Sequence, residues 1–354
     1  MINLKEIIDK SVQEHELTKG EIVTLLEIED KNTLNYLYQQ ADEIRQKYHG
    51  DEVHLRGIIE FSSYCKQNCY YCGLRKDNKE IDRYQLEIED IIEQALAGVE
   101  LGYRTIVLQS GEDDYSAEGI AEIVKEIKDK SDVAITLCIG ERSYKEYKLW
   151  REVGADRYLL KHETADQGLY NKLHPGMKYK ERIERLYWLK ELGYQTGGGN
   201  IIGLPGQTLD ILAEDILLFK ELKLDMVGIG PFISHQRTPL MGNKAGTVEM
   251  TLKVLAITRL LLPLSHLPAT TALGSIDDYG RQKALKAGAN VVMPNITRSK
   301  YRPLYEIYPA KICIEEKASD CRQCIGGIIN SLGRIVSTEK GDSLQRFVIF
   351  STEK

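Results

Sequence analysis

The sequence has no apolar run near the roughly 18 residues of a membrane-spanning helix. It also has no excess of basic residues, since the formal net charge is −6 and the pI about 5.8. The first absence argues against a membrane partner, and the second against a protein that binds nucleic acid through a basic face. The N-terminus lacks the apolar core of a signal peptide, so we expect a cytoplasmic location.

Short apolar runs rich in β-branched residues alternate with longer amphipathic stretches from residue 53 onward. This alternation predicts an α/β protein with a parallel sheet, because such strands are buried on both faces. We expect eight strands, over residues 53–61, 104–110, 132–140, 156–163, 195–203, 226–232, 268–273 and 289–294. Eight strands with seven intervening helices predict a complete (βα)8 barrel of the TIM type.

Glycine positions favour the barrel over a doubly wound sheet. A glycine stands just before four expected strands, where it would cap the preceding helix: Gly102, Gly154, Gly193 and Gly288. No early dinucleotide fingerprint is present, and the Gly-rich stretch 196–200 lies inside a strand. We divide the chain into an N-terminal helical extension (1–50), the barrel (51–300) and a C-terminal segment (301–354) with a Cys-bearing loop and a helix at 325–336.

Six of the seven cysteines fall in two tight groups. In an unexported chain this is typical of metal-binding or catalytic sites rather than disulfides. Cys65, Cys69 and Cys72 follow the first strand with the spacing C-x3-C-x2-C, at the end of the barrel where active sites lie. Three thiolates without a fourth suit an iron–sulfur cluster with one open iron, or a zinc site completed by a distant histidine.

The string "CKQNCYYC" after the first strand resembles the radical S-adenosylmethionine (SAM) enzymes. The resemblance implies a [4Fe–4S] cluster whose open iron is chelated by SAM, and reductive cleavage of SAM to a 5′-deoxyadenosyl radical. It also implies that "QSGEDD" meets the SAM ammonium, although Ser110 replaces the first Gly of the family's motif, that Glu163 meets the ribose, and that Arg182 meets the carboxylate. The implied SAM-binding set is Tyr71, Gln109, Ser110, Gly111, Glu112, Glu163, Arg182 and Tyr305.

Longer strings, among them "GIGPFISHQRTPL" and "PATTALGS", look like the HydE-type [FeFe]-hydrogenase maturase family over roughly residues 50 to 325. The resemblance implies a role in assembling the two-iron subcluster of the H-cluster, with an organometallic iron–cysteine–carbonyl–cyanide substrate. It implies an electron donor such as ferredoxin or flavodoxin, and other hydrogenase maturases, including the scaffold protein, as partners. Candidate cavity residues near the strand ends are Thr136, Arg157, His162, Thr270, Thr271 and Met293.

Cys313, Cys321 and Cys324, spaced C-x7-C-x2-C, form the second group. The resemblance implies a second iron–sulfur cluster here, either [2Fe–2S] or [4Fe–4S]. Two other functions stay open. One is a radical SAM synthase of the biotin or methylornithine type that acts on a small organic substrate. The other is an iron–sulfur carrier or scaffold, which would be expected to use four cysteines per cluster.

Overall fold

The computed structural model describes residues 3–345. Three helices precede the sheet in the stretch where the sequence predicted a helical extension. They are α1 (Leu4–Glu14), α2 (Lys19–Leu26) and α3 (Lys31–His49). Thr18 and Glu21 form a reciprocal capping box at the start of α2. Gly50 ends α3 with a φ of 61°. Helix α3 packs against α10 (Val248–Leu261), which is why α10 is buried on nearly every side.

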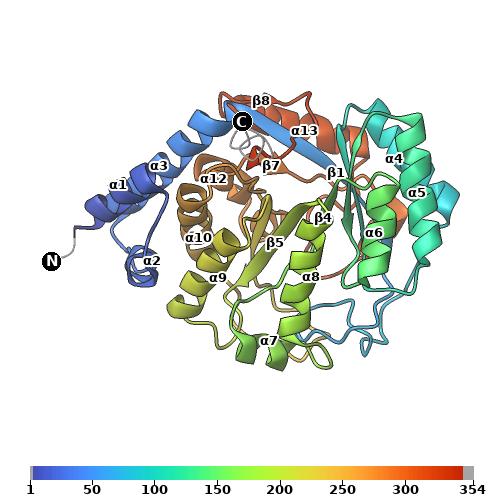
Figure 1. Ribbon diagram of the computed structural model, residues 1–354, viewed down its shortest axis with the longest axis horizontal. Coiled ribbons are helices and arrows are strands. Elements are labelled where there is room, and N and C mark those ends of the chain that lie inside the picture. Colours follow the sequence, from blue (N-terminus) through green and yellow to red (C-terminus); the bar gives the residue numbers. More distant parts are fainter. Residues whose placement is uncertain (1–2, 346–354) are drawn as a thin grey trace.

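A parallel sheet forms the centre of the molecule (Figure 1). Its strands follow the order β6-β5-β4-β3-β2-β1-β7. Its strands are β1 (Glu52–Ser62), β2 (Thr105–Ser110), β3 (Ala134–Cys138), β4 (Arg157–Leu159), β5 (Gln195–Ile202), β6 (Met226–Pro231) and β7 (Val291–Val292). Single parallel bridges join Met226 to His266 and Pro268 to Val291, and so connect β6 to β7. The prediction of an α/β barrel is confirmed.

The strand predicted at 268–273 is wrong. Pro268 makes one bridge, and a helix, α11 (Thr271–Ile276), begins three residues later with Thr270 as its N-cap. Proline has no N–H for a strand ladder, which limits pairing at this position. Thr270 and Thr271 therefore lie at a helix start instead of on a strand.

Helices surround the sheet on the outside (Figure 1). Besides α10 and α11 they are α4 (Ile88–Glu100), α5 (Ala117–Lys130), α6 (Tyr144–Glu152), α7 (Gln167–Leu173), α8 (Tyr179–Glu191), α9 (Leu209–Glu221) and α12 (Gly280–Lys286). The four glycines expected to end helices all have positive φ: Gly102 at 86°, Gly154 at 111°, Gly193 at 77° and Gly288 at 104°. That expectation is confirmed.

The C-terminal segment crosses the barrel from one end to the other. It holds the 3-10 helix η1 (Ser299–Leu304), α13 (Ala318–Ser331) and β8 (Ile335–Val336), which pairs with the start of β1. The predicted helix at 325–336 is wrong at both ends, because α13 starts at Ala318 and Gly333, with φ 71°, follows its end. Within residues 3–345 no helix has the length and apolar character to cross a membrane. The domain limits stay a prediction, and residues 346–354 lie outside the described part.

Candidate active site

The first cysteine group lies in the loop after β1, at the C-terminal end of the barrel. Cys65, Cys69 and Cys72 all line one cavity of about 410 Å³. The loop turns back on itself, because the Cys72 N–H donates to the Cys69 carbonyl at 3.3 Å. Burial raises the pKa of all three thiols, that of Cys72 to about 12, so a metal must displace their protons. Three sulfur donors beside open space fit an iron–sulfur cluster with one iron left for another ligand.

The loop after β2 packs directly on the first cysteine. The Gly111 N–H donates to the Ser62 carbonyl at 3.0 Å. A Cβ atom on Gly111 would lie 2.2 Å from the Tyr64 carbonyl oxygen and 2.9 Å from the Cys65 Cβ, so only glycine fits. Gly111 itself therefore does not line the cavity, whereas its neighbours Ser110 and Glu112 do.

A buried charge network joins three elements on the cavity wall. Arg182, from α8, donates to Glu112 Oε1 at 3.3 Å and to Glu141 Oε1 at 2.7 Å. Gln67, from the cysteine loop, donates to the other Glu112 oxygen at 2.7 Å. The Arg182, Glu112 and Glu141 side chains are only 9%, 10% and 11% exposed. Their hydrogen bonds hold the cysteine loop, the loop after β2 and α8 in one arrangement.

Glu163 enters the cavity beyond the end of β4 with a φ of 66°. This left-handed conformation is unfavourable for a residue with a Cβ and persists only where the surroundings fix it. The Glu163 N–H donates to the Gly199 carbonyl and its carbonyl accepts from the Ile201 N–H, both at 3.0 Å. Its carboxylate lies 3.0 Å from Lys161 Nζ, and both side chains line the cavity. The backbone hydrogen bonds to β5 thus hold the Lys161–Glu163 ion pair where a polar ligand in the cavity can contact it.

A buried histidine orients Tyr71. The Tyr71 hydroxyl lies 2.7 Å from His174 Nε2, and His174 Nδ1 lies 2.7 Å from the Tyr170 carbonyl. Burial lowers the pKa of His174 to about 3, so the ring is neutral at pH 7. A carbonyl only accepts, so Nδ1 carries the proton and Nε2 accepts from the Tyr71 hydroxyl.

We expect His174→Phe to weaken SAM binding by about 2- to 10-fold, the equivalent of one lost hydrogen bond. The phenyl ring still packs on Tyr170 but offers no acceptor to Tyr71. The SAM-induced change in the cluster spectrum measures the affinity. His174→Gln, which keeps an acceptor, is expected to lose less. Equal affinities in the two variants and the wild type would contradict the role of His174 in positioning Tyr71.

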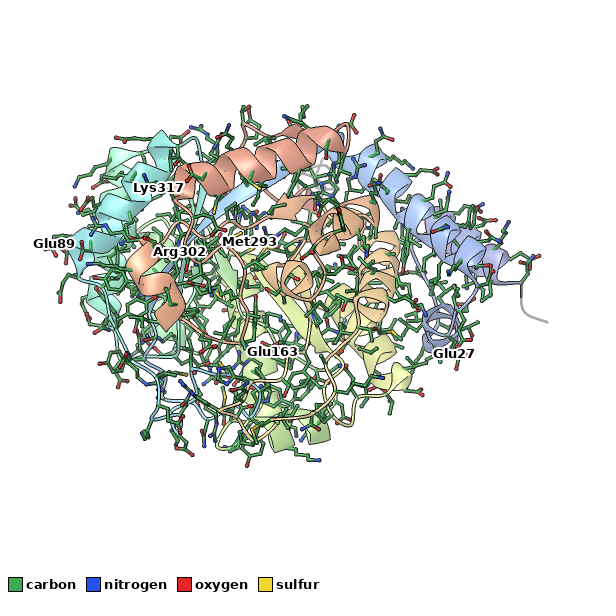
Figure 2. All side chains as sticks on the ribbon, turned by 180° about the vertical axis from the view of Figure 1, so that it is seen from behind. Glu27, Glu89, Glu163, Met293, Arg302 and Lys317 are labelled. Atoms are coloured by element: carbon green, nitrogen blue, oxygen red, sulfur yellow. The ribbon has the colours of Figure 1, made fainter. Side chains whose placement is uncertain are left out.

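Nine of the predicted SAM and substrate residues line the same cavity as the first three cysteines (Figure 2 labels two of them, Glu163 and Met293). They are Tyr71, Gln109, Ser110, Glu112, Glu163, Arg182, Thr270, Thr271 and Met293. Their roles toward SAM and substrate stay predictions, but the fold brings them together around one space.

Five predicted residues do not line this cavity: Gly111, Thr136, Arg157, His162 and Tyr305. Arg157 and Thr136 pair in register one layer lower in the barrel, where Arg157 bonds Asp342 Oδ1 at 2.8 Å. His162 follows Lys161 directly in the extended chain, so its side chain points to the opposite side. It packs on Phe219 of α9, with ring centroids 5.5 Å apart. Tyr305 is buried beneath Lys311.

The sequence did not suggest several polar residues that line the cavity. Lys311, from the C-terminal segment, forms a buried ion pair with Glu60 of β1. Asn295 donates to the other Glu60 oxygen at 2.6 Å, and Tyr308 lies on the same wall. Side chains alternate between the two faces of an extended chain, so Lys161, two residues before Glu163, could have been predicted to face the cavity with it. Lys311 lies in a loop without periodicity, and no pattern placed it near β1.

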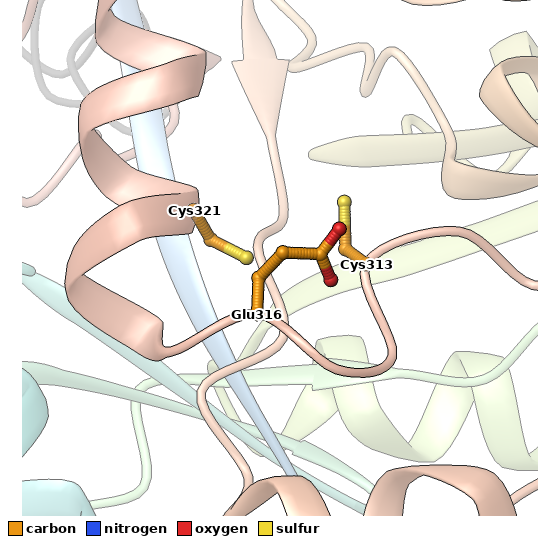
Figure 3. Close-up of side chains that lie close together, drawn as sticks. All are labelled: Cys313, Glu316 and Cys321. Atoms are coloured by element: carbon orange, nitrogen blue, oxygen red, sulfur yellow. The ribbon is translucent and has the colours of Figure 1, made fainter.

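The second cysteine group lies beside the same cavity, which Cys313 and Cys321 also line. Figure 3 shows the side chains of Cys313, Glu316 and Cys321 close together. Ligand atoms of Cys313, Cys321 and Glu316 lie within 4.8 Å of one another. A hydrogen bond with Cys321, followed by the charge of Arg281, lowers the pKa of Cys313 to about 6. Cys324 is exposed and lies outside this group. Glu316 is a metal-ligand candidate that the spacing of the cysteines did not indicate.

Known proteins are similar to this chain in sequence and in fold. A family model described as the Radical SAM superfamily matches residues 59–219. The [FeFe] hydrogenase maturase subunit HydE of Thermotoga maritima is 52% identical over 331 residues, which cover 93% of this chain and 94% of that protein. The 3-methylornithine synthase of Methanosarcina acetivorans is 33% identical over 287 residues, or 80% of this chain and 81% of that one.

The crystal structure of methylornithine synthase (PylB) superposes with a TM-score of 0.82 at 29% identity, and covers 94% of this chain and 97% of that one. Its likeness extends over the whole barrel and beyond it, as the coverage shows. The chain therefore belongs to the radical SAM superfamily and, within it, to the family of the [FeFe] hydrogenase maturase HydE.

Proposed function

We propose that the chain binds a [4Fe–4S] cluster on Cys65, Cys69 and Cys72 and SAM in the adjoining cavity. The observation that carries the proposal is that three thiols, the Glu112–Arg182 pair and Glu163 line one cavity. When bound, the cluster and SAM together supply a one-electron reductive cleavage that yields a 5′-deoxyadenosyl radical. The arrangement of protein groups then decides where SAM lies and what reaches the radical.

The chain's own residues bind and orient in this scheme. Glu163 is placed to accept from ribose hydroxyls, because its backbone conformation aims the carboxylate into the cavity. Arg182 already donates to Glu112, Glu141 and the Lys161 carbonyl. A SAM carboxylate on Arg182 would share that guanidinium with these acceptors, while Glu112 would accept from the SAM ammonium. Tyr71, fixed by His174, closes the same wall.

The substrate that we propose is an organometallic iron–cysteine–carbonyl–cyanide unit, used in maturation of the [FeFe]-hydrogenase active site. The support is the 52% identity to the Thermotoga maturase over almost the whole chain. A ferredoxin or flavodoxin as electron donor, other maturases including the scaffold protein as partners, and a cytoplasmic location belong to the same proposal. So does a second iron–sulfur cluster, [2Fe–2S] or [4Fe–4S], at Cys313, Cys321 and Cys324.

A second candidate is a synthase that acts on a small organic substrate. The favouring observation is the 33% identity to 3-methylornithine synthase over 80% of the chain. The cavity also carries two ion pairs, Lys161–Glu163 and Lys311–Glu60, which suit an amino acid as well as a metal complex with a cysteine ligand. Stimulation of SAM cleavage by the organometallic compound, and not by free amino acids, separates the two candidates.

We expect the reconstituted protein to form 5′-deoxyadenosine from SAM under dithionite without oxygen, and Cys69→Ala to form none. The alanine variant has only two of the three thiols that the cluster needs. Chromatography of the nucleoside measures the product.

Cys138→Ala is the matched control, because Cys138 ends β3 and does not line the cavity. It is expected to keep the product. Product from Cys69→Ala at the wild-type rate, or neither product nor a SAM-induced spectral change in the wild type, would overturn the proposed function.

A further inference from the structure

The loop that carries the first cysteines also reaches the surface. Tyr64, next to Cys65, is 47% exposed. The loop then doubles back, with the Lys76 N–H donating to the Gln67 carbonyl at 2.8 Å, which brings Lys76 beside Lys66. Both lysines are exposed, as is Lys79. The cysteine loop therefore presents three exposed lysines to solvent.

A second loop, between β6 and α10, continues this surface. Arg237 donates to the Glu80 carbonyl at 2.9 Å and pairs with the Glu80 carboxylate at 3.2 Å, so the two loops touch. Lys244 and Met241 on the same loop are exposed, Met241 to 63%. We call residues 64–83 and 232–247 together the basic surface. Figure 1 shows the first of these loops in light blue beyond the C-terminal end of β1.

Positive charge accumulates here although the chain as a whole is acidic. The basic surface contains seven Lys and Arg residues against three Asp and Glu residues, whereas the whole chain has 47 against 53. Two of those acids are already paired, Asp77 with Arg75 at 3.5 Å and Glu80 with Arg237. Across residues 3–345, no ion pair involves Lys66, Lys76, Lys79 or Lys244 (their ammonium groups stay available to a partner).

We propose that the basic surface docks an acidic one-electron carrier protein, which reduces the cluster site. This inference rests on the proposed function, since the bound cluster must gain one electron from a donor that loses one. The segment that holds Cys65, Cys69 and Cys72 meets solvent here, and its three cysteines line the cavity. An acidic partner gains faster association and a fixed orientation from opposite charge. Redox encounters need little buried area, and the exposed side chains of Tyr64 and Met241 offer apolar contacts.

The test uses the full-length reconstituted protein and flavodoxin as the probe. One variant reverses three charges of the basic surface: Lys76→Glu, Lys79→Glu and Lys244→Glu. A matched control reverses three exposed lysines on other elements: Lys31→Glu, Lys125→Glu and Lys286→Glu. None of the six side chains lines the cavity. Both variants change the net charge equally, so a difference between them reports the location of the charge.

We expect the first variant to bind flavodoxin at least about 10-fold more weakly in 0.1 M salt and to form 5′-deoxyadenosine correspondingly more slowly with reduced flavodoxin. With dithionite its rate is expected to equal that of the wild type, and the control is expected to match the wild type in every assay. Equal flavodoxin affinity in the two variants would overturn the docking surface. If the wild type forms no product with dithionite, the proposed function is overturned instead. The flavodoxin affinities of the two variants still test the docking surface in that case.

Discussion

Lys311→Met is expected to lower the free energy of unfolding by about 3–5 kcal/mol. The Lys311 ammonium pairs with Glu60 inside the barrel, and the two side chains are only 8% and 3% exposed. Methionine would leave the Glu60 carboxylate buried, with the Asn295 amide at 2.6 Å as a hydrogen-bond donor but with no countercharge. Urea unfolding followed by circular dichroism, with wild type and variant in the same cluster state, measures the loss.

Two further variants separate the ion pair from packing. Glu60→Gln combined with Lys311→Met removes both charges and is expected to recover most of the lost stability. Lys283→Met breaks an ion pair with Asp277 in which the lysine is 48% exposed, and is expected to cost less than about 1 kcal/mol. If Lys311→Met costs no more than Lys283→Met, the buried pair does not stabilise the fold.

The Glu60–Lys311 pair also links the two cysteine groups. Lys311 lies two residues before Cys313, and Glu60 lies five residues before Cys65. Both side chains line the cavity that the two groups share. Weakening this pair is therefore expected to loosen the cavity wall between the two centres.

Local patterns explain what the sequence could predict. Glycines with positive φ and apolar runs located most strands, because both signals depend on neighbouring residues only. The three cysteines after β1 were predictable as one centre for the same reason: they lie within eight residues. Glu112 and Glu163 were predicted through the resemblance to the radical SAM enzymes, and their place after strands agrees with the rule that strand ends meet at one end of a barrel.

The sequence did not predict features that depend on a residue's depth in the barrel or on contacts between residues far apart in the chain. Arg157 lies on a barrel strand as expected, but one layer below the cavity, and its strand position does not reveal that depth. The C-terminal segment supplies its partners Lys340 and Asp342. Glu316 joins Cys313 and Cys321 only through a loop conformation that no periodicity encodes. Pro268 interrupts the seventh predicted strand, but the prediction followed the apolar pattern and placed a strand there.

Acidification is expected to destabilise the fold strongly, because five histidines are buried in neutral form. Burial is the largest cause in each case: it lowers the pKa of His49 to about 2, of His54 to about 4, of His162 and His174 to about 3, and that of His266 well below its usual value. Nearby arginines add to the effect, Arg259 at His49 and Arg56 at His54 and His266. Three of these rings gather at the N-terminal end of the barrel, with the His266 centroid 5.3 Å from His49 and 5.1 Å from His54.

The sign follows from proton binding. Below about pH 6.5 the unfolded chain protonates these histidines and the folded chain does not, so the stability that is complete above pH 6.5 is lost as the pH falls. Asp215 acts in the opposite direction, because burial raises its pKa to about 8 and the folded state holds its proton between about pH 4 and 8.

From pH 7 to 5.5 we expect a net loss of about 4 kcal/mol in the free energy of unfolding, measured by urea titration. Asp215→Asn removes the opposing proton and is expected to increase the loss by about 2 kcal/mol, whereas a flat profile in both proteins would show that the histidines are charged in the folded state.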